Sequence, residues 1–267
     1  MGLLSAVLSL PVSIILVRTM MKRKTGEPFS KGDVTGLLLW GALSAVLAMA
    51  VTGVITAWKA IRFFGPELVK EAFKNPQGDA LQKIWEIIQN TPEEEFSYLS
   101  IFLNTLLSVG IVEELSRYLI LRASTKNKAC CVSWLDMVLC GGIVGVGFQI
   151  LEDLFYSSGG IATAVMRAIT PFHFTFGVIM GYYIGKAKVT GKILYHLPAL
   201  LIPVLLHTLF DSSIHAMEQV EDFFLLVLFS IILLLVLTFV MLKKIRKWSG
   251  SGELDVPLNG EAPRQAA

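Results

Sequence analysis

Long apolar segments separated by charged loops constrain this 267-residue chain more than any other feature of its sequence. Each segment is about 20 residues long, which as a helix matches the hydrocarbon core of a bilayer, about 30 Å thick. The composition agrees, because 54% of the residues are hydrophobic and only 16% are charged, whereas soluble domains average about 45–50% and about 25%. A soluble enzyme, a disulfide scaffold and a disordered protein are excluded. The sequence predicts an integral membrane protein.

The apolar runs predict an all-α bundle of about seven transmembrane helices. We expect these helices at residues 3–20, 34–57, 99–121, 132–156, 167–185, 193–215 and 223–242. Every second loop is rich in Lys and Arg, and the loops between them carry none or an excess of acids. Because cationic loops stay in the cytoplasm, we expect the N-terminus outside and the C-terminus inside.

The same pattern divides the chain into five parts. We expect two N-terminal helices in 1–57, an amphipathic extracytoplasmic insert in 58–98, a four-helix core in 99–215, a C-terminal helix with a basic stop in 216–248, and a disordered cytoplasmic tail in 249–267. Within the insert, amphipathic stretches around Pro66–Phe73 and Leu81–Ile88 predict an interfacial helical hairpin.

The net charge and the cysteines give no sign of three common features: nucleic-acid binding, a disulfide framework and a zinc knuckle. A formal net charge of +2 gives no indication of a nucleic-acid partner. The three cysteines, Cys130, Cys131 and Cys140, are odd in number and lack CxxC spacing, so neither a disulfide framework nor a zinc knuckle is indicated.

Ionisable residues lie inside four of the predicted helices, where each costs at least about 2.5–3.5 kcal/mol at the helix centre. Those singled out are Glu113, Glu114, Arg117, Glu152, Asp153, Arg167, His173, His207 and Asp211. Because four helices each contribute acids or histidines, we expect one shared polar site that opens to the outside.

The spacing of these residues predicts two pairs. His207 and Asp211 are four residues apart and share a helix face, so Asp211 can accept the proton of one imidazole nitrogen and leave the other nitrogen for substrate, water or metal. Glu113 and Arg117 are also four apart, and Arg117 is expected to compensate one of the adjacent glutamates while the other stays free.

Four segments resemble the motifs of the PrsW family of intramembrane proteases, part of the wider CPBP superfamily that includes CAAX prenyl proteases. They are EELSR (113–117), GFQILEDLFY (147–156), RAITPFHFTFGVIMGYYIG (167–185) and HTLFD (207–211). They occur in the family's order, on four predicted membrane helices. Two departures are Arg117, where Lys is usual, and Asp153, where Asn is common.

The resemblance implies a protease of the bacterial plasma membrane that cuts a single-pass membrane protein, an anti-sigma factor, near its extracytoplasmic surface. The site residues are then Glu113, Glu114, His173 and His207, with Tyr156 and Arg167 among the supporting residues.

Two mechanisms remain open, since the chain has no GxSxG, GxGD or HExxH motif. In the metal-free version Glu113 or Glu114 is the general base, His173 orients the water, and His207, held by Asp211, stabilises the oxyanion. In the metal version Glu152, His173 and His207 bind zinc and leave one position for water. The HxxxD spacing favours the metal-free version.

Three other functions compete with the protease. A CAAX-type prenyl-protein protease would have His in place of Glu152. A proton- or metal-coupled transporter would also use buried acids and histidines, but no internal repeat of the transporter kind is present. A non-catalytic scaffold would leave the buried charges unexplained.

Overall fold

The computed structural model describes residues 2–75, 78–90, 96–126, 128–155 and 160–258. The side chains of 2–6, 85, 88–90 and 160–164 lie outside this description, as do Tyr156 and the last nine residues of the predicted tail.

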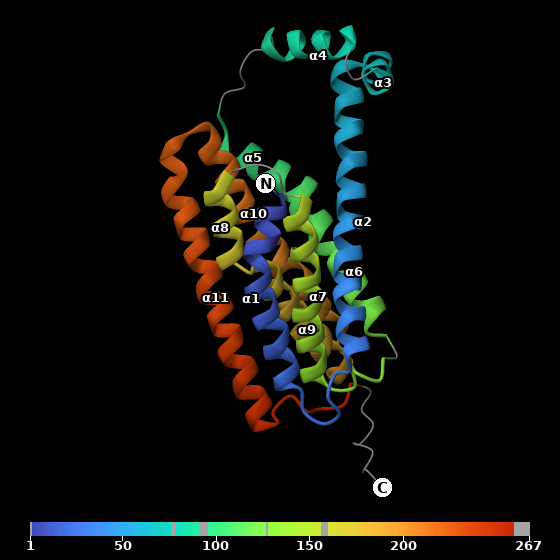
Figure 1. Cartoon of the computed structure of the whole chain (residues 1–267), viewed down its shortest axis with the longest axis vertical. Coiled ribbons are helices and arrows are strands. Elements are labelled where there is room, and N and C mark those ends of the chain that lie inside the picture. The colour runs from blue at the N-terminus through green and yellow to red at the C-terminus, as the bar shows by residue number, and fades with distance from the viewer. Residues whose placement is uncertain (1, 76–77, 91–95, 127, 156–159, 259–267) are drawn as a thin grey trace.

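The described residues fold into helices joined by short turns (Figure 1). The α-helices are α1 (Gly2–Arg23), α2 (Lys31–Phe64), α3 (Pro66–Lys74), α4 (Asp79–Asn90), α5 (Tyr98–Thr105), α6 (Ile111–Ser124), α7 (Trp134–Phe155), α8 (Gly160–Ile169), α9 (Phe172–Thr190), α10 (His196–Gln219) and α11 (Phe224–Ser251). A π-helical turn, η1 (Leu106–Gly110), joins α5 to α6, and 3₁₀ turns η2 (Ile193–Tyr195) and η3 (Glu221–Phe223) precede α10 and α11.

Helix α7 forms the centre of the bundle and packs mainly against α9, α2 and α1. Glycines make this packing close. A methyl group on Gly141 would overlap the carbonyl oxygen of Gly177 in α9, and one on Gly147 would overlap that of Leu38 in α2. Small residues at such crossings let membrane helices approach backbone to backbone, which brings α7 into direct contact with α9 and α2.

Among the described residues, five helices are long and apolar enough to cross a membrane. They are Lys31–Phe64, Tyr98–Ser124, Trp134–Phe155, Ile193–Gln219 and Glu221–Ser251. The other two expected segments, 3–20 and 167–185, fall on α1 and on α8 with α9, which are not among these five. The chain is therefore an all-helical membrane protein, and the count of seven spans stays a prediction.

The expected single helix at 167–185 is wrong, because the chain breaks between α8 and α9. Pro171 lacks an N–H and disfavours helical geometry at the preceding residue, and the Thr170 hydroxyl donates to the Met166 carbonyl at 2.6 Å at the end of α8. As a result His173 lies in the first turn of α9.

The second membrane helix is longer than the sequence predicts. Helix α2 continues to Phe64 instead of ending at 57, and at its start Ser30 and Asp33 form a capping box. Helices α3 and α4 fall on the two amphipathic stretches expected at Pro66–Phe73 and Leu81–Ile88. Figure 1 shows α2 extending beyond the bundle, with α4 running crosswise to it.

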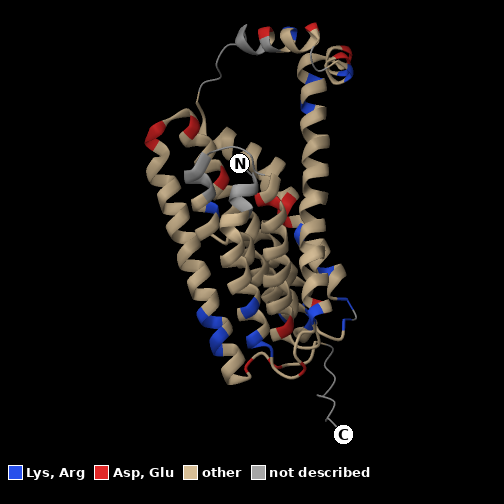
Figure 2. Ribbon diagram, in the orientation of Figure 1, with Lys and Arg blue, Asp and Glu red and all other residues tan. Residues whose placement is uncertain are grey.

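Basic residues gather at one end of the bundle (Figure 2), where α1 ends, α2 begins and α11 ends. Lys24 of this end forms a buried ion pair with Asp136 at 2.7 Å, and Asp136 also accepts hydrogen bonds from the backbone N–H groups of Val132 and Ser133. These contacts fix the start of α7.

The expectation of disorder is wrong for the first part of the tail. Helix α11 reaches Ser251, and the chain then returns to α7, where Leu254 and Leu258 are buried. The backbone N–H groups of Trp134 and Leu135 donate to this segment. The polar composition of the tail obscured these two leucines.

Candidate active site

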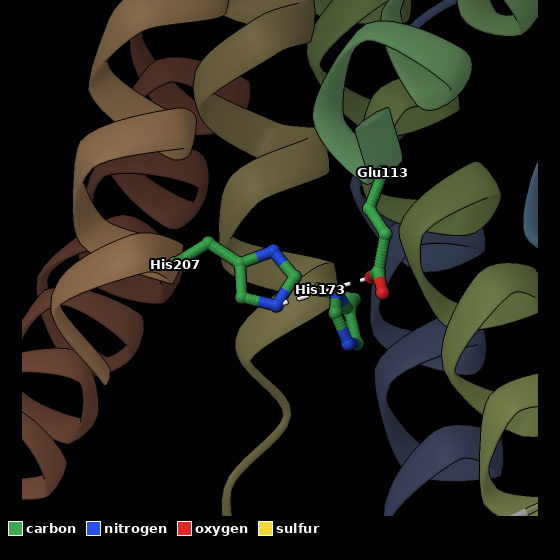
Figure 3. Close-up of side chains that lie close together, drawn as sticks. All are labelled: Glu113, His173 and His207. Atoms are coloured by element: carbon green, nitrogen blue, oxygen red, sulfur yellow. Dashed lines mark ion pairs between the residues drawn. The ribbon is translucent and has the colours of Figure 1, made fainter. Parts of the chain in front are cut away.

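Glu113 of α6, His173 of α9 and His207 of α10 point toward one another (Figure 3). One ligand atom from each lies within 4.8 Å of the others. The π-helical turn η1 comes just before Glu113, and such turns re-aim the residues that follow them and occur often at functional sites. Gly110 in this turn lies against Thr208, which brings α6 and α10 together.

Glu114 and Arg117 form a fully buried ion pair in which Arg117 Nη1 donates to Glu114 Oε2 at 2.5 Å. The guanidinium also lies 3.9 Å from the centre of the Phe148 ring. The i,i+4 pairing expected between Glu113 and Arg117 is wrong. Arg117 pairs instead with Glu114, three residues before it, because Glu114 is the glutamate that faces the bundle interior.

The Glu114–Arg117 pair holds both histidines by their Nδ1 atoms. Glu114 Oε1 lies 2.7 Å from Nδ1 of His207, and Arg117 Nη2 lies 2.8 Å from Nδ1 of His173. A guanidinium can only donate, so His173 Nδ1 accepts and the ring proton is on Nε2, which lies 2.6 Å from Glu152 Oε2. A carboxylate can only accept, so His207 Nδ1 carries a proton.

The outer edge of His207 faces two further carboxylates. Its Nε2 lies 3.2 Å from Asp211 Oδ2, as the HxxxD spacing predicts, and 3.8 Å from Glu113 Oε2. The expectation that the other nitrogen stays available for substrate, water or metal is wrong, because Glu114 lies 2.7 Å from Nδ1. Glu113 Oε2 is buried and makes no hydrogen bond within the described residues. Of the two adjacent glutamates, Glu113 therefore has an oxygen that can accept a hydrogen bond from water or substrate, whereas both oxygens of Glu114 already contact Arg117 and His207.

Arg167 ties the end of α8 to the end of α7. It contacts Glu152 at 2.8 Å and Asp153 at 2.6 Å, and its carbonyl oxygen accepts from Gln149 at 3.3 Å. Through Glu152 this group reaches His173. Each supporting residue predicted from the sequence therefore contacts the site or one of its neighbours, except Tyr156, which lies outside the described residues.

A small polar cavity of about 30 Å³ lies beside the histidines. Its lining includes Glu152, Arg167, His173, His207 and Asp211. The volume is enough for about one or two water molecules, which need several polar partners when buried. The arrangement can therefore hold a water next to a carboxylate and two imidazoles, the groups that hydrolysis requires.

The side chains of this cluster meet only some of the requirements of a zinc site. Glu113, His173 and His207 match zinc in residue type, with Glu113 where the sequence suggested Glu152. A metal-binding imidazole donates its other N–H to an acceptor, and His207 does so to Glu114. His173 does not, because Arg117 donates to its Nδ1 and its Nε2 carries the proton. The residues therefore do not fit a zinc ion bound by both histidines.

The contact between Arg117 and Phe148 was not anticipated from the sequence. Phe148 also lies 4.7 Å, centre to centre, from the His173 ring, so it supports two site residues. Its position four residues before Glu152, on the same helix face, was the available signal.

His196 and His215 are not brought to this site. His196 packs edge-on against Tyr118, and Nδ1 of His215 lies 3.4 Å from the Thr105 hydroxyl.

Comparisons with known proteins agree with these motifs. Residues 31–241 match the family model described as PrsW family intramembrane metalloprotease. Protease PrsW of Bacillus subtilis (strain 168) is 33% identical over 124 residues, 44% of this chain and 57% of that protein. Protease PrsW of Oceanobacillus iheyensis is 32% identical over 129 residues, 46% of this chain and 60% of that protein.

The matched region thus spans less than two thirds of the length of these curated relatives. No solved structure matches the chain. The family and the apolar helices identify a multi-pass protein of the bacterial cell membrane.

Proposed function

Because the chain belongs to the PrsW family of intramembrane proteases, we propose that it cuts a membrane-anchored polypeptide with a water activated by Glu113. The observation that carries this proposal is the contrast within the EE pair. Glu113 faces both histidines with an oxygen that has no hydrogen-bond partner among the described residues, and Glu114 is fully paired.

In this mechanism Glu113 takes a proton from a water that lies between it and the imidazoles, and the resulting hydroxide attacks the peptide carbonyl. His173, whose Nε2–H faces Glu152, lines the small cavity with that carboxylate and helps to hold the water there. His207, with Nδ1 held by Glu114 and Nε2 beside Asp211, stabilises the oxyanion by donating from Nε2 when both of its nitrogens are protonated. Glu113 then passes its proton to the leaving amine.

No step of this mechanism uses a metal, although the family description names a metalloprotease. The hydrogen bond from Arg117 to His173 supports this choice, since it leaves no lone pair on His173 Nε2 for a cation.

The position of the site supports a membrane topology. Glu113, Glu152 and His173 lie at the ends of α6, α7 and α9 that are remote from the basic end of the bundle. With the basic end in the cytoplasm, the site opens to the outside, seven helices span the membrane with the N-terminus outside, and the 58–98 insert is extracytoplasmic. We propose a single-pass anti-sigma factor as the substrate, and membership of the CPBP superfamily, from the motif resemblance.

Cleavage of a tagged single-pass substrate by the purified, reconstituted protein tests this function. We expect Glu113→Gln to lower the rate by about 10²–10⁴-fold, the usual range for losing a general base, with thermal stability unchanged. The matched control is Glu221→Gln, an exposed glutamate outside the site, which should cleave normally. Cleavage by Glu113→Gln at the wild-type rate would contradict the assignment.

The same preparation tests the metal. We expect cleavage to survive extended treatment with a strong chelator, and elemental analysis to find no stoichiometric zinc. Loss of activity that zinc restores would show a metal mechanism. Absence of cleavage together with proton or metal flux in liposomes would favour a transporter.

A further inference from the structure

A second cavity is lined by Glu113, which is not part of the lining of the water-sized pocket. It is an open groove of about 460 Å³, within the range of about 300–1,000 Å³ that is common for ligand sites. We call it the α2–Glu113 groove, and its lining residues are Met49, Thr52, Gly53, Thr56, Ala57, Ala60, Phe73 and Glu113.

One face of α2 forms the wall of this groove. The six α2 residues in this lining lie three or four positions apart along the chain, and two of the positions are followed directly by another member. This is the spacing of residues that share one helix face. Gly53 has open space where a side chain would begin. Thr52 donates to the Ser108 carbonyl at 3.3 Å, which fixes α2 against the π-helical turn next to Glu113. The wall of the groove therefore consists of small, mainly apolar residues on a helix that is held in place.

Glu113 connects the groove to the polar site. It lines the groove, and its Oε2 lies 3.8 Å from Nε2 of His207, which lines the water-sized pocket. A molecule in the groove would therefore meet the Glu113 carboxylate on one side, with room for water on the other side of the Glu113–His207 pair.

The chemistry of this surface selects its occupant. A lipid chain suits the apolar wall but offers nothing to a buried carboxylate oxygen, which is costly to leave without a donor. An extended peptide offers both apolar side chains and backbone N–H groups, because an extended strand has no internal hydrogen bonds.

We propose that the α2–Glu113 groove receives the membrane-embedded segment of the polypeptide substrate in an extended conformation, with its side chains against Gly53 and Ala57 and its scissile peptide at Glu113. This inference rests on the proposed protease function. The small residues at 53 and 57 leave room for a bulky substrate side chain, so this part of α2 selects among substrates.

Filling the groove tests the cleavage role. Gly53→Leu places a side chain in open space and should lower cleavage of a single-pass substrate by about tenfold or more, with the fold retained. Gly36→Leu is the matched control, since Gly36 lies on the same helix, outside the groove, and also has open space at its Cβ. Equal rates for Gly53→Leu and the wild type would overturn the proposal.

A binding experiment separates this proposal from the protease function. The probe is a tagged single-pass peptide of about 20 apolar residues with a Gly-Pro pair near its outer end and one cysteine beside it. In proteoliposomes of the full chain carrying Glu113→Gln, we expect an oxidant to link the probe to Gly53→Cys and not to Gly36→Cys.

The outcomes distinguish the two ideas. Linkage of the probe at position 53 without cleavage by the wild type would contradict the protease function and support the docking surface. Cleavage by the wild type without linkage at position 53 would support the protease function and overturn the docking proposal. Phospholipid held at position 53, detected with a photoreactive lipid, in place of the probe would show the groove to be a lipid site and would also overturn the proposal.

Discussion

At the scale of single residues, Glu113 and Glu114 are chain neighbours with different environments. Glu114 has no exposed surface and contacts Arg117 and His207, whereas 18% of the Glu113 side chain is exposed and it lines the groove. About 100° of helix rotation separates two consecutive residues. That rotation is enough to turn one carboxylate into the packed interior and the other toward the cavities.

Arg117 should be the most sensitive supporting residue, because it pairs with Glu114 and fixes the tautomer of His173. We expect Arg117→Met to destabilise the protein by about 3–5 kcal/mol, the usual cost of leaving one member of a buried ion pair alone. Arg117→Lys keeps the charge and should retain most of the stability and part of the activity.

Thermal unfolding in detergent and substrate cleavage measure the two effects. Because Lys has three donors but no planar fork, it cannot reproduce both contacts with the same geometry. A stable Arg117→Met variant with normal cleavage would refute the positioning role.

The pairings within the site show how far the sequence predicts it. The i,i+4 spacing correctly placed Asp211 beside His207, because both residues lie on one regular helix. The same rule gave the wrong partner for Arg117, since positions three and four residues away are both within reach on a helix. Only the tertiary packing of α6 against α7 and α9 decides between them.

At the scale of elements, the crossing of α7 and α9 determines where His173 lies. A methyl group on Gly145 would overlap the carbonyl oxygen of His173 itself. We therefore expect Gly145→Ala to push the two helices apart, to destabilise the protein by about 1–3 kcal/mol as overpacking does, and to lower cleavage by displacing the imidazole.

Gly36→Ala is the control for this substitution. It adds the same methyl group within α2, where nothing lies close, and replacing glycine inside a helix should stabilise by about 0.5–1 kcal/mol. Unfolding and cleavage of the two variants are compared side by side. A Gly145→Ala protein that behaves like Gly36→Ala would show that the close crossing is dispensable.

Element boundaries were predicted less well than element positions. The break before α9 was marked in the sequence by Pro171, yet the apolar run on both sides concealed it. The extension of α2 to Phe64 was concealed in the opposite way, because charged Lys59 and Arg62 suggested that the helix had ended. Hydropathy reports the surroundings of a segment, and a helix can continue out of the membrane.

At the scale of the whole molecule, the C-terminal segment closes the basic end of the bundle. Asp255 accepts a hydrogen bond from Thr25 at 2.6 Å, and the N–H of Leu258 donates to the Val132 carbonyl at 2.9 Å. Residues from three distant parts of the chain thus meet next to the buried Lys24–Asp136 pair. Such long-range contacts leave no periodic signal in a single sequence.

Truncation measures what this closure contributes. A chain ending at Ser251 loses the burial of Leu254 and Leu258, each of which is worth about 1.5–3 kcal/mol when fully buried. It also loses the backbone hydrogen bonds to Trp134 and Leu135. We expect it to unfold at a lower temperature in detergent, whereas a chain ending at Leu258 keeps all of these contacts and should match the full chain. Because the segment lies at the opposite end of the bundle from Glu113, the shorter chain should cleave at the normal rate while it remains folded.

Two results would contradict these expectations. Equal unfolding temperatures for both truncations would mean that the returning segment adds no stability. Loss of cleavage by the shorter chain below its unfolding temperature would mean that the two ends of the bundle are coupled.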